Sequence, residues 1–175
     1  LLEENILGTL GSLPDYEWKC RSRENIRPEG MRTTDQFVLG LLPSKGERFG
    51  CIPMPPEKTW KLPSLCVALN LYLKIAVPAS VVSEVSTISV LRNVESEPHV
   101  DGNNKGDSWG LAFGDFEGGG LWVVDGREGA DLEYCLREVV RGPTGRIRYK
   151  AGTYTGRVLD TRRCPRQFDG NSLHF

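Results

Sequence analysis

The sequence predicts a mainly β domain with flanking helices, of the β-sandwich or jelly-roll type. The chain has 175 residues, of which 39% are hydrophobic, a size and composition that suit one compact core. It contains one clear amphipathic helical pattern, followed by many short stretches of strand-like composition between turn residues. A helix laid against many short antiparallel strands favours such a fold.

Residues 1–60 form the least regular part of the sequence. Within them, only residues 36–42 have the composition of a buried strand. We therefore expect an irregular N-terminal flank over residues 1–60 and a jelly-roll core over residues 61–175, as parts of a single domain. The prolines that interrupt the first segment are Pro14, Pro28, Pro43, Pro53, Pro55 and Pro56.

Residues 63–76 have the pattern of an amphipathic helix. Pro63 suits a first helical turn, Leu65 and Leu69 begin a series at spacings of three and four, and Pro78 follows the end. From Ser83 the pattern changes to alternation with period two, which predicts a strand leading towards His99.

Short strands and turns are expected over the rest of the chain. Gly118–Gly120 is interpreted as a hairpin turn and Asp169–Asn171 as a tight turn, because glycine and asparagine tolerate positive φ. The strands are expected over residues 108–116, 121–124, 146–149, 156–160 and 173–175.

Composition argues against several classes of protein. No apolar run approaches the roughly 20 residues of a membrane span, and the first residues lack the basic start of a signal peptide. The five cysteines include no C-x-x-C pair, which argues against a disulfide framework or a zinc ribbon. We expect a soluble, intracellular protein, cytoplasmic or nuclear, with reduced thiols and no membrane partner.

Basic residues gather between positions 137 and 166. Against Glu138 and Asp160, this segment holds nine arginines and lysines, although the net charge of the whole chain is −1. Such asymmetry indicates either an anionic partner, with nucleic acid as the candidate, or a solvated hairpin face.

The chain has only two histidines, and one of them lies in the motif Pro98-His99-Val100-Asp101. In an extended segment, residues two apart project to the same side, so His99 and Asp101 can reach one metal ion. The second imidazole could come only from His174, more than seventy residues later. Two histidines and one carboxylate are the ligands of non-haem Fe(II) oxygenases, whereas a turn histidine and a strand histidine without a metal are the alternative.

Four blocks in order, covering about residues 36–175, resemble a known family. The blocks are Ser86–Val90, Pro98–Ser108, Leu111–Val123 and Phe168–His174. They resemble the 2-oxoglutarate/Fe(II)-dependent dioxygenases related to the TET and J-binding proteins, in particular the type associated with mobile elements.

This resemblance implies a double-stranded β-helix, or jelly roll, with iron held by His99, Asp101 and His174. It implies Fe(II) as the metal, 2-oxoglutarate and dioxygen as cosubstrates, and hydroxylation of a C–H bond, with a nucleobase as a candidate substrate. The competing hypothesis is a non-catalytic jelly-roll module, or a degenerate fragment, of a mobile-element polyprotein.

The sequence departs from the family at its end. Members place an arginine for the cosubstrate carboxylate roughly ten residues beyond the distal histidine, on the next strand, and this chain ends at Phe175. We therefore expect the last strand to be missing and 2-oxoglutarate to bind poorly to the chain as given.

Four further residues are candidates for the substrate pocket. Asn103, Asn104 and Ser108 follow the metal motif and could line its mouth, while the alternative is a polar turn without function. Trp109 could stack on a flipped base, although strand tryptophans are more often part of a core.

Overall fold

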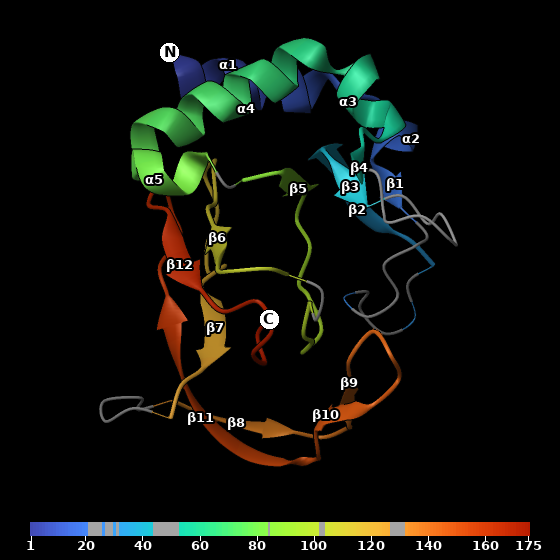
Figure 1. The fold of residues 1–175 in the computed structure, drawn as a ribbon, viewed down its shortest axis with the longest axis vertical. Coiled ribbons are helices and arrows are strands. Elements are labelled where there is room, and N and C mark those ends of the chain that lie inside the picture. Colours follow the sequence, from blue (N-terminus) through green and yellow to red (C-terminus); the bar gives the residue numbers. More distant parts are fainter. Residues whose placement is uncertain are drawn as a thin grey trace. The chain divides into compact units, whose positions relative to one another are not determined.

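The computed structural model describes residues 1–20, 26, 30, 32–43, 53–83, 85–101, 104–126 and 132–175 (Figure 1). The chain divides into two compact units. The first comprises Leu1–Ser22 and Thr33–Val94, and the second comprises Arg23–Arg32 and Glu95–Phe175. The division into a 1–60 flank and a 61–175 core stays a prediction.

The prediction of a mainly β chain with helices is confirmed. The strands form several small antiparallel sheets, and within the described ranges these sheets do not close into a barrel. The finer assignment to a jelly roll stays a prediction.

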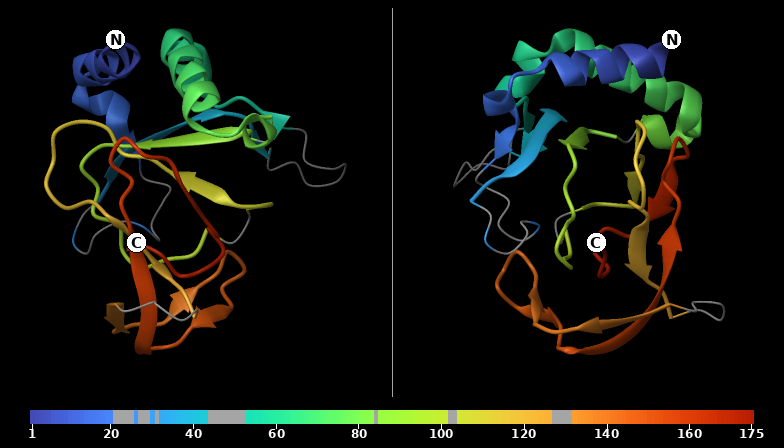
Figure 2. Two further views of the ribbon diagram at one scale, coloured as in Figure 1. Left: turned by 90° about the vertical axis from the view of Figure 1, so that its left-hand side faces the viewer. Right: turned by 180° about the vertical axis from the view of Figure 1, so that it is seen from behind.

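The five α-helices found in the described residues all belong to the first unit. Helix α4 begins with Pro63 in its first turn and ends before Pro78, as the sequence predicts, and it buries Leu65 and Leu69. Helix α1 packs against α4, and both views in Figure 2 place the two side by side. The helices are α1 (Leu2–Ser12), α2 (Asp15–Trp18), α3 (Glu57–Lys61), α4 (Pro63–Ala76) and α5 (Ala79–Val82).

Helix α1 lies in the segment for which the sequence predicts no long element. It forms because the first proline, Pro14, comes only after its end, and Glu3 and Glu4 lie in its first turn, where negative charge favours a helix. Its one fully buried residue is Ile6.

A three-stranded sheet in the order β1-β2-β5 completes the core of this unit. Strand β2 (Thr34–Gly40) is the buried strand that the sequence predicts, and β5 (Thr87–Leu91) alternates between exposed and half-buried residues, as predicted. Strand β1 (Lys19–Cys20) pairs with β2, and the short strands β3 (Leu42–Pro43) and β4 (Pro53–Met54) pair with each other.

The named elements of the second unit, among its described residues, are all strands. Three sheets have the orders β7-β11-β8, β10-β9 and β12-β6. The longest strand, β11, is curved in Figure 1 and pairs with β7 on one side and β8 on the other. The strands are β6 (Ser108–Gly110), β7 (Leu121–Val124), β8 (Leu132–Leu136), β9 (Val140–Arg141), β10 (Ile147–Tyr149), β11 (Gly152–Leu159) and β12 (Arg166–Phe168).

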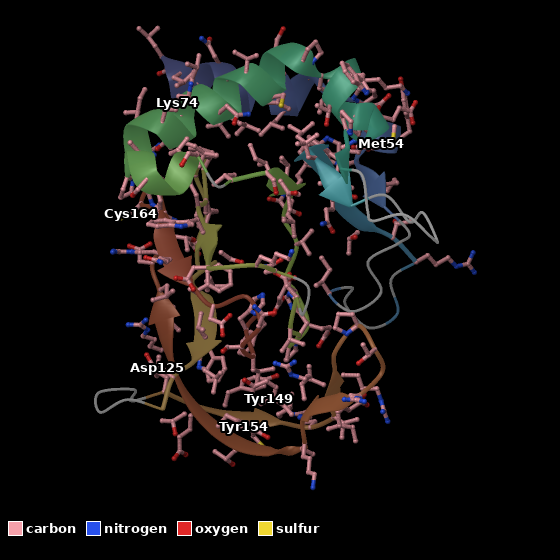
Figure 3. The ribbon with its side chains drawn as sticks, in the orientation of Figure 1. Met54, Lys74, Asp125, Tyr149, Tyr154 and Cys164 are labelled. Atoms are coloured by element: carbon pink, nitrogen blue, oxygen red, sulfur yellow. The ribbon has the colours of Figure 1, made fainter. Side chains whose placement is uncertain are left out.

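The core of the second unit is partly aromatic. Trp122 stacks on Phe175 with ring centroids 5.1 Å apart, and Tyr134 lies 4.4 Å from Phe175. The rings of Tyr149 and Tyr154 meet edge to face, with centroids 5.4 Å apart (Figure 3). The buried residues of this core are Val100, Trp122, Leu136, Val140 and Leu173.

Two local predictions in this unit are wrong. The strand expected over residues 108–116 ends at Gly110, and Gly118–Gly120 is not a hairpin turn, because β6 pairs with β12 and β7 pairs with β11. The glycines are nevertheless required locally, since Gly118 and Gly119 have φ values of +71° and +72°. The loop links two different sheets, which local sequence does not reveal.

No helix in the described part of the chain is long and apolar enough to cross a bilayer. Among the described side chains, Cys66, Cys135 and Cys164 are free cysteines.

Candidate metal centre

Three side chains of the second unit meet in one place: His99, Asp101 and His174. Each offers one ligand atom, and these atoms all lie within 4.8 Å of one another. Nε2 of His99 lies 3.9 Å from Oδ1 of Asp101, and Nε2 of His174 lies 3.9 Å from Oδ2 of the same carboxylate. The sequence predicts this set, and the fold brings its members together across more than seventy residues.

Backbone pairing joins the two histidines. The N–H of His99 donates to the carbonyl of His174 at 3.0 Å, and the N–H of His174 donates back at 3.1 Å, so the two residues form an antiparallel bridge. Directly opposite residues in such a pair project to the same face, which places both imidazoles side by side. Their ring centroids are 4.3 Å apart.

The segment that carries His174 is also held on its other side. Phe175 and Trp122 exchange two backbone hydrogen bonds of 3.0 and 3.1 Å, and Val124 donates to Leu173 at 2.9 Å. His174 therefore lies between β7 and the segment of His99, in the position of a central strand. The predicted strand 173–175 is present only as these bridges.

Asp101 is held through its own backbone. Its N–H donates to the carbonyl of Gly170 at 2.8 Å, so the chain after His99 is tied to the turn that precedes His174. The two histidines are 7% and 4% exposed, whereas the side chain of Asp101 is 23% exposed. The site thus has buried imidazoles and one carboxylate that reaches solvent.

Both imidazoles have the same hydrogen-bonding arrangement. Nδ1 of His99 lies 2.7 Å from the carbonyl oxygen of Glu97, and Nδ1 of His174 lies 2.8 Å from that of Ser172. A carbonyl oxygen only accepts, so each Nδ1 carries the proton and donates. In the neutral ring, Nε2 then keeps its lone pair, as a metal-binding histidine requires.

This donor set fits a divalent transition metal. Imidazole nitrogen and carboxylate oxygen suit iron, zinc and manganese, and three protein ligands leave positions for water or substrate. His99, Asp101 and His174 can therefore hold a metal ion.

The candidate pocket residues have different surroundings from one another. Asn104 and Ser108 lie beside the carboxylate, because Nδ2 of Asn104 is 3.3 Å from Oδ2 of Asp101 and 2.7 Å from Oγ of Ser108. Trp109 lies on β6 opposite Gln167, half-buried. Asn103 lies outside the described residues.

Sequence reasoning missed the turn over Asp169–Ser172 as a support of the site. The Asp169 carboxylate accepts from the hydroxyl of Ser172 at 2.8 Å and from the backbone N–H of Asn171 at 2.9 Å. These bonds, that of Ser172 first, hold the pKa of Asp169 below its ordinary value. The carbonyls of Gly170 and Ser172 in this turn receive the bonds from Asp101 and His174.

Part of that role had a sequence signal. The Asp-Gly-Asn run indicates a tight turn shortly before His174, and the turn is observed. Which carbonyl accepts from which imidazole follows from the folded backbone, and no local pattern predicts it.

The chain was compared with models of known protein families, with curated proteins and with solved structures, and no match was found. The site is therefore interpreted from its own geometry and from the residue patterns given above.

Proposed function

We propose that this protein is an Fe(II)- and 2-oxoglutarate-dependent dioxygenase that hydroxylates a C–H bond, with a nucleobase as the candidate substrate. The observation that carries the proposal is the convergence of His99, Asp101 and His174, whose ligand atoms lie within 4.8 Å of one another. Two histidines and one carboxylate with open positions are the ligand set of non-haem Fe(II) oxygenases.

In such a reaction, the protein itself positions the metal ligands and limits the access of water. The Nδ1 bonds to Glu97 and Ser172 hold both rings with Nε2 towards the carboxylate, and the burial of both histidines limits access from one side. When bound, the iron would supply the activation of dioxygen and the oxidative decarboxylation of 2-oxoglutarate. The exposed fraction of Asp101 marks the side from which small molecules would enter.

An anaerobic Fe(II) titration tests the ligand set. We expect the wild type to bind one equivalent and His99→Ala, His174→Ala and Asp101→Ala to lose this binding. Asp107→Ala is the matched control, because Asp107 is an exposed aspartate a few residues further on that bonds Gln167. Equal binding by all variants would exclude the site.

The cosubstrate is tested on the same samples. Because 2-oxoglutarate is expected to bind poorly to this chain, it is added in large excess and without oxygen, and it should then give the visible charge-transfer absorption of the Fe(II) complex in the wild type and in Asp107→Ala. Fe(II) binding that depends on the histidines, without any response to 2-oxoglutarate, would contradict the dioxygenase and favour a non-catalytic metal module.

We also propose nucleic acid as the partner of the segment 137–166. All nine basic side chains of this segment are exposed or half-buried. Arg157 pairs with Asp125 at 3.1 Å, and Arg163 also has an interaction partner, whereas the other seven form no ion pair within the described part of the chain. Because these positively charged side chains belong to the unit that holds the metal centre, they suit a polyanionic substrate. The nine residues are Arg137, Arg141, Arg146, Arg148, Lys150, Arg157, Arg162, Arg163 and Arg166.

A further inference from the structure

A small polar network contacts Oδ2 of the Asp101 carboxylate. Nδ2 of Asn104 lies 3.3 Å from Oδ2 of Asp101 and 2.7 Å from Oγ of Ser108, so its two N–H groups have one acceptor each. Asn104 is itself exposed, and asparagines in such a place are commonly solvated. Here the amide is instead shared between a candidate metal ligand and a strand residue of β6.

The orientation of the Asn104 amide follows from its neighbours. If the amide were turned over, its oxygen would face the carboxylate of Asp101, and two acceptors would lie against each other without a proton between them. The observed orientation is therefore the one that the carboxylate requires. It places a donor on Oδ2, which also lies 3.9 Å from Nε2 of His174, while Oδ1 lies 3.9 Å from Nε2 of His99.

The backbone of Asn104 is held from the opposite side. Nδ2 of Asn171 donates to its carbonyl at 3.3 Å, and Asn171 belongs to the turn that also binds the N–H of Asp101. Gly170 in that turn is buried, and a Cβ built on it would lie 2.6 Å from Nδ2 of Asn104 and 2.5 Å from Oγ of Ser108. The absence of a side chain at Gly170 thus leaves room for the network.

We infer that Asn104 is a positioning residue, which holds the Asp101 carboxylate in its metal-binding orientation through a hydrogen bond to Oδ2. This inference rests on the metal site of the proposed function and goes beyond it, because it assigns Asn104 to the metal centre rather than to the substrate. Ser108 acts through Asn104, since its hydroxyl holds the amide. Partners of this kind commonly contribute about 10- to 100-fold to metal affinity.

Titration with Co(II) alone tests this role, because cobalt reports its ligand geometry through its visible absorption and needs neither cosubstrate nor substrate. We expect Asn104→Ala to bind Co(II) roughly 10- to 100-fold more weakly than the wild type, with an altered visible spectrum. Lys105→Ala is the matched control, since Lys105 is an exposed residue next in the chain, and it should behave as the wild type.

Two further measurements separate positioning from a merely structural role. The thermal midpoints of the metal-free Asn104→Ala and Lys105→Ala proteins should agree with that of the wild type, because Asn104 is exposed. Ser108→Ala should weaken Co(II) binding less than Asn104→Ala, and the double variant should bind no more weakly than Asn104→Ala alone.

The possible outcomes are distinct. If Asn104→Ala binds Co(II) with the affinity and spectrum of the wild type, the inference is overturned, while a site that depends on His99 and His174 still supports the proposed function. Additive losses in the double variant would also contradict it, because Ser108 would then act independently. If the wild type shows no Co(II) binding that depends on the histidines, both the inference and the proposed function fail.

Discussion

At the scale of single residues, the two histidines of this chain have matching roles. His99 and His174 bond each other through their backbones, and each donates Nδ1–H to the carbonyl two residues before it. The pairing sets the position of each ring, and the carbonyl sets its tautomer. A metal site needs the right ring position and the right tautomer. The shared arrangement of His99 and His174 therefore supports a metal site more strongly than their proximity does.

The close packing around Gly170 predicts that a side chain at this position disturbs the metal site. A Cβ at this position would lie 2.5 Å from Oγ of Ser108 and 3.2 Å from Oδ2 of Asp101, closer than real Cβ atoms approach in the first case. Gly170→Ala should therefore push the carboxylate out of place and weaken Co(II) binding by about tenfold or more, the lower end of the usual effect of disturbing groups behind a ligand.

The same titration on Gly126→Ala provides the control. Gly126 is exposed, and apart from its chain neighbours no atom of the described residues lies within 4 Å of a Cβ built there, so this variant should bind Co(II) as the wild type does. Unchanged affinity in Gly170→Ala would show that the network adapts to an added methyl group.

At the scale of helices and strands, a prediction is confirmed where the spacing of apolar residues matches the buried side of the element. Helix α4 is predicted with its start and its end, because Pro63 fits a first turn and Pro78 prevents continuation. The series at spacings of three and four contains Leu65, which is 2% exposed, and leaves out Leu71, which is 48% exposed. Periodicity therefore indicates the buried side of this helix as well as its extent.

The basic strands β9 and β10 give a prediction for the proposed nucleic-acid partner. Arg141 and Arg148 are exposed on these strands, and their bonds run to the backbone oxygens of Gly145 and Asn171. Replacing both by glutamine removes two charges that could bind phosphate. We expect weaker binding of short DNA and RNA. The slope of log affinity against log salt concentration should become shallower by about 1 for each arginine that binds a phosphate in the wild type.

The control for this pair is Lys74→Gln, an exposed cation on α4 in the first unit (Figure 3). It should leave both the affinity and the salt slope unchanged. An equal loss in all variants would indicate a general effect of net charge, and no binding by the wild type would favour the alternative of a solvated hairpin face.

At the scale of the whole molecule, the chain comprises two units with different kinds of support. The first unit has helices packed with a small sheet, and its strands are joined by an ion-pair network. Asp35 on β2 pairs with Lys19 on β1, and it pairs with Arg92, whose guanidinium lies 2.5 Å from Oδ2. Arg92 also lies over the ring of Trp18, 4.7 Å from its centroid.

This network predicts how stability depends on pH. The hydrogen bond from Lys19 is the main cause that holds the pKa of Asp35 below its ordinary value of 3.8, and Arg92 contributes as well. Because the folded pKa is the lower one, the contribution of Asp35 is fully present above the unfolded pKa. It is lost as the pH falls through the folded pKa.

Thermal unfolding between about pH 2 and pH 7 measures this effect. Near neutral pH, Asp35→Asn should be less stable than the wild type by roughly 1 kcal/mol, since the charged bonds are partly open to solvent. The two proteins should converge in acid as the wild-type carboxylate gains its proton. A constant difference across the whole range would rule out the titration of Asp35 as the cause.

Much of the local structure of this protein can be predicted from its sequence. The sequence predicted a mainly β chain, the helix 63–76, the strand near residues 36–42, the turn at Asp169–Asn171, and the three candidate ligands His99, Asp101 and His174. These features are local or compositional: proline and glycine act on their own turn, alternation reports one buried face, and a chain with two histidines offers few ligand sets.

How these segments pair with one another depends on the folded chain. The fold paired β6 with β12 rather than with the neighbouring strand, and it placed His174 between β7 and the segment of His99. It also placed Asn104, expected at the pocket mouth, against the carboxylate of Asp101. Strands pair, and imidazoles donate, through backbone N–H and C=O groups, which are nearly the same in every residue. The partners of these groups are therefore set by the path of the folded chain and not by the local sequence.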